Sequence, residues 1–155
     1  MQVQSVQIRQ ATENDLQAIV ALFADDPLGG HGDTTDPEAL PHYRAAFARI
    51  VASPNETLYV AEVDGEVVGT FQTMITTTLT GRGASNMIIE AVQTRADIRG
   101  RGIGAAMIAH AIEEAKRQEL RLVQLTSNAM RKDAHRFYER LGFAPTHLGF
   151  KLKLK

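Results

Sequence analysis

The sequence predicts an α/β (α+β) protein, in which helices flank a mixed, mostly antiparallel central sheet of six or seven strands. Two β-rich runs within residues 57–79 are joined by Asp64-Gly65, which is a strong signal for a tight hairpin. A third such run follows at 84–94, and from residue 103 the apolar residues change to helical spacing. With about four helices, the order is β-α-α-β-β-β-α-β-α-β, which is typical of helices covering a sheet.

The first elements follow from capping and breaker residues. Apolar alternation at 5–11 predicts a short strand. Thr12 is the expected N-cap of the first helix, with Asp15 at its third position. After a loop rich in glycine, Asp36 and Pro37 have the order of a cap and a first helical turn, so a second helix begins there.

The C-terminal half alternates helix and strand. Helical spacing runs over 103–117, and a strand is expected at 120–126. A helix over 131–142 ends at Gly142, which takes the position after the C-cap. The alternation of apolar residues with lysines at 150–155 predicts a final strand with one solvated face.

Length and composition indicate one ordinary globular domain, 1–155. The chain has 155 residues, 44% of them apolar and 23% charged. No apolar run is long enough to span a membrane, and the N-terminal segment lacks the apolar core of a signal peptide. We therefore expect a cytoplasmic protein.

Residue counts exclude several classes of site. The absence of cysteine removes disulfides, thiolate metal sites and a cysteine nucleophile. The 17 basic and 18 acidic side chains give a formal charge of −1, so no general basic field attracts nucleic acid. The five histidines lack metal-ligand spacing, so we expect no metal site.

A turn rich in glycine and arginine precedes the helix at 103–117. Arg99 and Arg101 alternate here with Gly100, Gly102 and Gly104. A helix N-terminus exposes unpaired N–H groups, and glycines let those groups approach an anion closely. A pyrophosphate would fit this turn; the alternative is that the glycines only turn the chain.

Two other phosphate-binding motifs fit less well. The letters GRGIGA satisfy a Gly-x-Gly-x-x-Ala dinucleotide fingerprint, which requires an acidic residue at the end of the next strand. That strand ends in Thr126-Ser127-Asn128, without a carboxylate. No Gly-Lys-Ser/Thr follows the glycines either, so a phosphate-loop NTPase is excluded.

Three motifs together resemble the GNAT superfamily of acetyl-CoA-dependent N-acetyltransferases. RGRGIG, from Arg99, fits its Arg/Gln-x-x-Gly-x-Gly/Ala signature, and IIEAVQT before it is similar to the family's fourth strand. DAHRFYERLGF is similar to the C-terminal Ala-x-x-x-Tyr-x-x-x-Gly-Phe motif, which includes Tyr138. The resemblance implies a GNAT-like acyltransferase fold that spans nearly the whole chain.

The resemblance also implies where acetyl-CoA would bind. Pantetheine would enter an opening between the fourth and fifth strands, and the pyrophosphate would lie on the loop that opens the following helix. Many family members have asparagine where this chain has Arg131, three residues after Asn128. The expected contacts are Val92, Gln93, Thr94, Arg99, Gly100, Arg101, Gly102, Ile103, Gly104, Ala105 and Asn128.

Two side chains are candidates for proton transfer. Glu90 lies within an apolar strand, where desolvation would make it a better base, acting directly or through water; the alternative is a solvated or arginine-paired carboxylate. The resemblance places Tyr138 near the coenzyme sulfur as the acid, whereas many buried tyrosines only satisfy their hydroxyl. Ser127 lacks an adjacent base, so direct transfer is favoured over a serine intermediate.

The expected acceptor is a primary amine of a small molecule. The loop between the first two helices carries Asp25, Asp26, Asp33 and Asp36, which would attract a cationic amine or simply cap helices and meet solvent. Residues 126–152 resemble the aminoalkylphosphonate N-acetyltransferases, which acetylate small primary amines. We expect no membrane or nucleic-acid partner, and a homodimer as the candidate assembly; protein acetylation and non-catalytic acyl-CoA binding are the alternatives.

Overall fold

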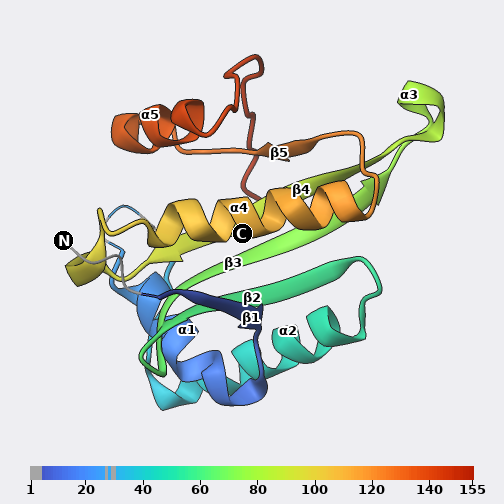
Figure 1. Ribbon diagram of the computed structural model, residues 1–155. Coiled ribbons are helices and arrows are strands. Elements are labelled where there is room, and N and C mark those ends of the chain that lie inside the picture. Colours follow the sequence, from blue (N-terminus) through green and yellow to red (C-terminus); the bar gives the residue numbers. More distant parts are fainter. Residues whose placement is uncertain (1–4, 27, 29–30) are drawn as a thin grey trace.

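The computed structural model describes residues 5–26, 28 and 31–155 and has one five-stranded sheet within them (Figure 1). The strands are adjacent in chain order, antiparallel except for the last pair, which is parallel. Their bounds are β1 Gln7–Gln10, β2 Glu56–Val63, β3 Glu66–Thr77, β4 Ser85–Thr94 and β5 Val123–Leu125. The α/β class and the mixed, mostly antiparallel sheet are therefore confirmed.

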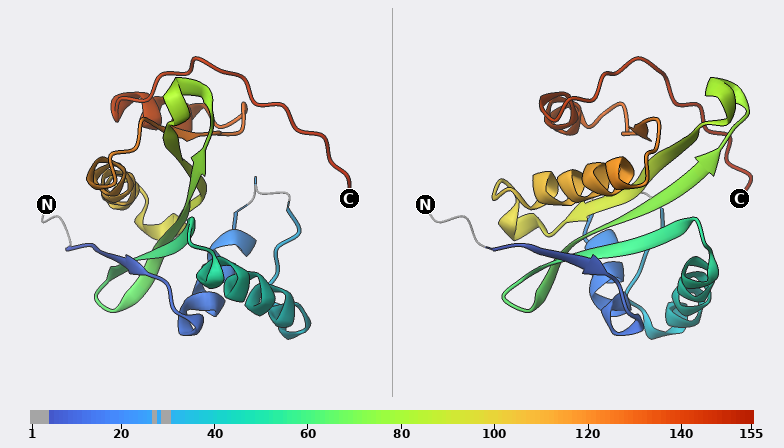
Figure 2. Two further views of the ribbon diagram at one scale, coloured as in Figure 1. Left: turned by 90° about the vertical axis from the view of Figure 1, so that its right-hand side faces the viewer. Right: turned by 45° about the vertical axis from the view of Figure 1, so that its right-hand side comes forward.

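Helices cover both faces of the sheet. Figure 2 shows α4 on one side and α1 and α2 on the other, with α5 beyond α4. Single 3₁₀ turns precede α1, α2 and the loop before α4. The helices are α1 Leu16–Ala24, α2 Leu40–Ala52, a short turn α3 Thr80–Gly83, α4 Ile103–Arg117 and α5 Lys132–Arg140.

The main core lies between α4 and the sheet. The apolar stripe expected on this helix is buried, with Met107, Ile108 and Ala111 at 0% exposure. Its packing is close enough that a Cβ atom on Gly69 of β3 would lie 2.9 Å from the sulfur of Met107. A side chain at Gly69 would therefore force the end of the Met107 side chain to shift.

The hairpin between β2 and β3 has the predicted turn. Asp64 and Gly65 have φ angles of 51° and 79°. Positive φ at both central residues is what a type I′ turn requires, and it fits the twist of the two strands.

An ion-pair network secures the start of α1. The carboxylate of Asp15 accepts hydrogen bonds from the Thr12 amide at 2.7 Å and from Nη1 of Arg9 at 2.8 Å. Arg9 also donates from Nη2 to Glu62 of β2 at 2.6 Å. Arg9 therefore links the expected N-terminal cap of the helix to strand β2 of the sheet.

Replacing Asp15 with asparagine is expected to lower the free energy of unfolding at pH 7 by about 1–3 kcal/mol, because Arg9 loses a charged partner that is only 9% exposed. The hydrogen bond from Arg9 lowers the pKa of Asp15 below 3.8. Its contribution is complete above that unfolded value and is lost as the pH falls through the folded value. Thermal denaturation from pH 7 to about 2 should therefore show the difference in Tm shrinking at the acid end.

The control is Glu13→Gln, which removes an ion pair with Arg44 between two exposed side chains. Exposed pairs contribute about 0–1 kcal/mol, so this variant should stay close to the parent protein. A Tm difference for Asp15→Asn that does not change with pH would contradict the assignment.

The expected final strand at 150–155 is wrong for this structure. Residues 144–155 form neither helix nor strand, and the sheet has five strands rather than six or seven within the described residues. One edge of the sheet is β1, and the other is β5, which is three residues long. Four large apolar side chains are consequently between 83% and 88% exposed: Leu148, Phe150, Leu152 and Leu154.

Candidate functional site

The glycine–arginine loop runs directly into α4. Gly100 and Gly102 have φ angles of 82° and 84°, and Gly102 is the N-cap of the helix. A side chain in this left-handed region would be strained, so these two glycines are required by backbone conformation. Arg99 and Arg101 are exposed on the same loop. The amides of the first helical turn therefore face a positively charged, open surface.

Gly104 has a different reason to lack a side chain. A Cβ atom at this position would lie 3.1 Å from Cζ of Phe137 on α5. The glycine thus allows the start of α4 and the middle of α5 to approach each other.

The two parallel strands separate beside this loop. Pairing between β4 and β5 covers three positions and stops at Ile89 and Leu125. The register of β4 against β3 shifts at the next residues, where Ala91 has a φ angle of 53°. This β-bulge increases the local twist, so the last part of β4 continues without β5. Val92, Gln93 and Thr94 are half-buried in that part of the strand.

Glu90 lies at the bulge, but it is not buried as its apolar neighbours suggested. Its side chain is exposed, and its cross-strand partner is Gln72 of β3. Ile89 belongs to the core that faces α4. Because side chains alternate along a strand, Glu90 faces the opposite side of the sheet, where α1 and α2 pack.

Tyr138 lies in the middle of α5 within an aromatic group. Its ring makes edge contacts with Phe137 and Phe143, at centroid distances of 5.1 and 5.8 Å. Burial raises the pKa of its hydroxyl, and the charge of Arg131 acts in the opposite direction. A hydroxyl that stays protonated at neutral pH can donate a proton.

Asn128 takes part in the turn that begins α5. Its side-chain oxygen accepts a hydrogen bond from the Met130 amide at 2.9 Å, and its carbonyl accepts one from the Arg131 amide at 3.0 Å. The side chain is exposed. Its expected contact with the cofactor stays a prediction.

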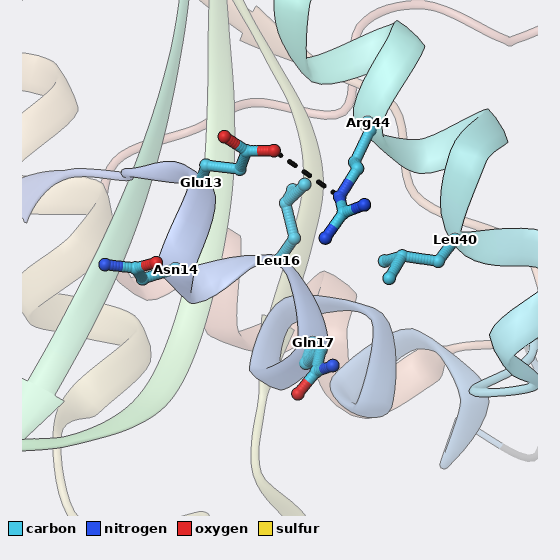
Figure 3. Close-up of a pocket in the computed structure, with 6 residues that line it drawn as sticks. All are labelled: Glu13, Asn14, Leu16, Gln17, Leu40 and Arg44. Carbon is cyan, nitrogen blue, oxygen red and sulfur yellow. Dashed lines mark ion pairs between the residues drawn. The ribbon is translucent and has the colours of Figure 1, made fainter.

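Two cavities lie where α1 meets α2. The first, of about 360 Å³, is lined by Glu13, Asn14, Leu16, Gln17, Leu40 and Arg44 and is crossed by the Glu13–Arg44 ion pair (Figure 3). The second, of about 290 Å³, is lined by residues of α1, α2 and the segment before α2. Neither contains Glu90, Tyr138 or the glycine–arginine loop.

Three of the four carboxylates named in the loop between α1 and α2 have hydrogen-bond partners. Asp36 caps the turn before α2 through the Glu38 amide at 3.0 Å, as expected. Asp33 accepts a hydrogen bond from the Tyr43 hydroxyl at 2.8 Å. Asp26 accepts one from Nη2 of Arg131 at 2.7 Å. In the sequence, Arg131 was noted only because it departs from the family motif. No sequence pattern indicates that it pairs with Asp26, 105 residues away.

Comparison with known proteins assigns this arrangement to a family. Residues 16–143 match the Acetyltransferase (GNAT) family, and this range runs from α1 through the loop and Tyr138 to Phe143. The chain belongs to the GNAT family. It is an acetyltransferase, and GNAT acetyltransferases use acetyl-CoA. None of the helices in the described residues is long and apolar enough to cross a membrane.

Individual GNAT relatives agree with this assignment. The chain is 32% identical to an aminoalkylphosphonate N-acetyltransferase from Salmonella typhimurium, over 93% of this chain and 88% of that one. It is 30% identical to an uncharacterized N-acetyltransferase from Methanocaldococcus jannaschii, over 91% of this chain and 62% of that one. A crystal structure of a transcriptional regulator from Bacillus halodurans C-125 is 41% identical, with a TM-score of 0.93, over 97% of this chain and 100% of that one.

Proposed function

We propose that the chain transfers the acetyl group of acetyl-CoA to a primary amine of a small molecule, directly within a ternary complex. The observation that carries the proposal is the junction of β4 and α4. There, Val92 to Thr94 continue past the end of β5, beside a helix start with two exposed arginines. Free strand groups can pair with the pantetheine amides, and the helix start can hold a pyrophosphate.

Acetyl-CoA supplies the acetyl group as a thioester, and two side chains of this chain handle the protons. Glu90, exposed on the side of the sheet that α1 and α2 cover, accepts the proton that the amine loses, through a water molecule. Tyr138 donates a proton to the leaving thiolate, because burial keeps its hydroxyl protonated. The nitrogen of the neutral amine forms the C–N bond as the C–S bond of the thioester breaks, so one proton leaves nitrogen and one reaches sulfur, and Glu90 and Tyr138 return to their starting states by proton exchange with water.

A relative supports a small amine as the acceptor. The Salmonella typhimurium enzyme, which covers nearly the same length, is named for aminoalkylphosphonates. Such compounds combine a primary amine with an anionic group, so they belong in the first test panel. We also propose a single catalytic domain over 1–155, located in the cytoplasm.

The test is a calorimetric titration with acetyl-CoA, followed by thiol release with a panel of amines. The panel contains an aminoalkylphosphonate, an amino acid, a polyamine and a lysine peptide. We expect saturable acetyl-CoA binding and continuous thiol release with at least one small amine. Release with the peptide alone would overturn the small-molecule acceptor, and an absence of acetyl-CoA binding would overturn the whole proposal.

A second candidate is an acyl-CoA-binding regulatory module, since the Bacillus halodurans relative is named a transcriptional regulator. The same titration separates the two functions. Tight acetyl-CoA binding with no thiol release from any amine would favour the regulatory module. The presence of both Glu90 and Tyr138 supports turnover instead.

We propose a homodimer in which the segment 144–155 packs against a second copy of the chain. Burying one Leu or Phe side chain removes roughly 60–120 Å² of apolar surface from water. A dimer would bury eight such side chains, four from each copy, and an equal area on the surfaces that they contact. The total buried area is then roughly 1,000–1,900 Å². A stable interface buries about 1,200–2,000 Å², a range that overlaps this area and so supports a dimer.

Replacing Leu152 and Leu154 with aspartate is expected to convert the dimer to a monomer, because two buried apolar contacts per chain become charged. Light scattering after size exclusion measures the mass. The matched control is Lys151→Gln with Lys153→Gln, which changes the other side of the same segment and should leave the dimer intact. A parent protein that is monomeric at micromolar concentration would contradict the proposal.

A further inference from the structure

We propose that Arg131 is a positioning residue for acetyl transfer: through its ion pair with Asp26 it ties the segment that follows α1 to the start of α5, the helix that carries Tyr138. This inference rests on the proposed function, because it concerns how the amine side of the site is placed relative to the proton donor. Asp26 and Arg131 are 105 residues apart in the sequence.

Each oxygen of the Asp26 carboxylate accepts one hydrogen bond. Its Oδ2 accepts a hydrogen bond from Nη2 of Arg131 at 2.7 Å, and its Oδ1 accepts one from the Leu28 amide at 3.1 Å. The Asp26 amide donates to the carbonyl of Phe23 at 3.2 Å, so the residue is fixed to the end of α1. The Asp26 side chain is 9% exposed. A carboxylate this buried depends on its partner, and losing that partner leaves an uncompensated charge.

Arg131 is equally fixed at the other end of the bridge. Its amide donates to the carbonyl of Asn128 at 3.0 Å, and its carbonyl accepts from the His135 amide at 3.1 Å. It is the N-cap residue of α5, whose second turn carries Tyr138. The ion pair therefore joins two helix ends through short, directional contacts, and a shift of either helix would break it.

The charges around the pair connect it to the rest of the site. Burial opposes the charged form of Asp26, but hydrogen bonds from Arg131 and the Leu28 amide outweigh burial and lower its pKa, and Arg99 of the glycine–arginine loop acts in the same direction. The charge of Arg131 also lowers the pKa of Tyr138. The charges of the pair therefore act on both the cofactor loop and the proton donor.

The experiment is a double-mutant cycle with Asp26→Asn, Arg131→Gln and the double variant. Each single change should lower kcat/KM for the amine by roughly tenfold, and the double variant should be no worse than either single one, because both break the same contact. The Kd for acetyl-CoA should change by less than about threefold. Losses that simply multiply in the double variant would overturn the proposal.

The pH profile of kcat separates positioning from simple structural support. Arg131→Gln removes a positive charge near Tyr138 and should move the high-pH limb upward. Asp26→Asn leaves Arg131 without its counter-charge and should move the same limb downward. Identical profiles for both variants would show that the pair serves stability alone and would overturn the proposal.

A matched control pair lies on α5 itself. Asp133 and Arg136 form an ion pair in which both side chains are exposed. The cycle with Asp133→Asn and Arg136→Gln removes the same kinds of side chain from the same helix. It should leave kcat/KM and the pH profile unchanged.

Hydrogen exchange gives a readout that does not need turnover. Asp26→Asn should increase exchange both at the first turn of α5, including the His135 amide, and at the end of α1. If no amine releases thiol, the proposed function fails, but exchange still decides whether the pair joins the two helices. Faster exchange at α1 alone would overturn the positioning role.

Discussion

Replacing Tyr138 with phenylalanine is expected to lower kcat by roughly 10²–10⁴-fold while leaving acetyl-CoA affinity within about a factor of two, because the ring stays and only the proton donor is lost. Phe137 and Phe143 contact the Tyr138 ring, and phenylalanine preserves both contacts. Steady-state kinetics with the amine found in the panel, combined with calorimetry for acetyl-CoA, measure the two quantities separately.

The pH dependence of kcat provides a second test of Tyr138 as the acid. An acid works only while protonated, so kcat should fall as the pH rises through the pKa of Tyr138. Burial raises that pKa from its usual value of 10, which places the decline in the alkaline range. This high-pH limb should disappear in Tyr138→Phe.

The control is Tyr59→Phe, which removes another hydroxyl whose pKa is raised by burial, on β2 within the core. Its kcat should equal that of the parent protein. Parent-level turnover in Tyr138→Phe would remove the acid role and leave Tyr138 as a packing residue.

Replacing Gly102 with alanine is expected to weaken acetyl-CoA binding by roughly 10- to 30-fold, because an L residue in the left-handed region costs about 1–2 kcal/mol. The loop can relieve this strain only by rotating the backbone at the start of α4. That rotation turns the first amides away from the pyrophosphate, so the cost falls on binding as well as on stability. Calorimetric titration with acetyl-CoA measures the loss.

Gly65→Ala is a close control for this variant. Gly65 has a φ of 79° against 84° for Gly102, and neither position has an atom within 4 Å of an added Cβ. The two variants should therefore lose similar stability, whereas only Gly102→Ala should lose affinity. Equal acetyl-CoA affinities in the two variants would show that the pyrophosphate binds elsewhere.

Local patterns predicted most of the fold correctly. The helical spacing gave the bounds of α4, and the Asp64-Gly65 pair gave the hairpin, because both depend on residues close together in the chain. Gly142 has the positive φ, 101°, that a position after a helix C-cap requires. These features could be predicted because neighbouring residues alone determine them.

The errors and omissions involve contacts between distant segments. The sequence left Glu90 open as a desolvated base or a solvated carboxylate; the side chain is exposed, and which of the two holds depends on how closely α1 and α2 cover that face of the sheet. The final strand was expected because apolar residues alternate with lysines at 150–155. Such a pattern indicates a segment that can form a strand, but it does not show whether the sheet has a free edge for it. Gly104 lacks a side chain because the ring of Phe137, on another helix, lies next to it. Arg131 pairs with Asp26, which lies just after α1. Neither contact could be predicted from neighbouring residues.

The close packing of α4 links the glycine–arginine loop to the stability of the whole molecule. Met107, Ile108 and Ala111 have no exposed surface, so the helix cannot peel away from the sheet while the core persists. An anion held by the first amides of this helix would be released only by dissociation or by global unfolding. Occupancy of the loop should therefore slow protease cleavage at every bond that is exposed only by global unfolding, including bonds far from the anion, whereas the exposed segment 144–155 should be cleaved as before.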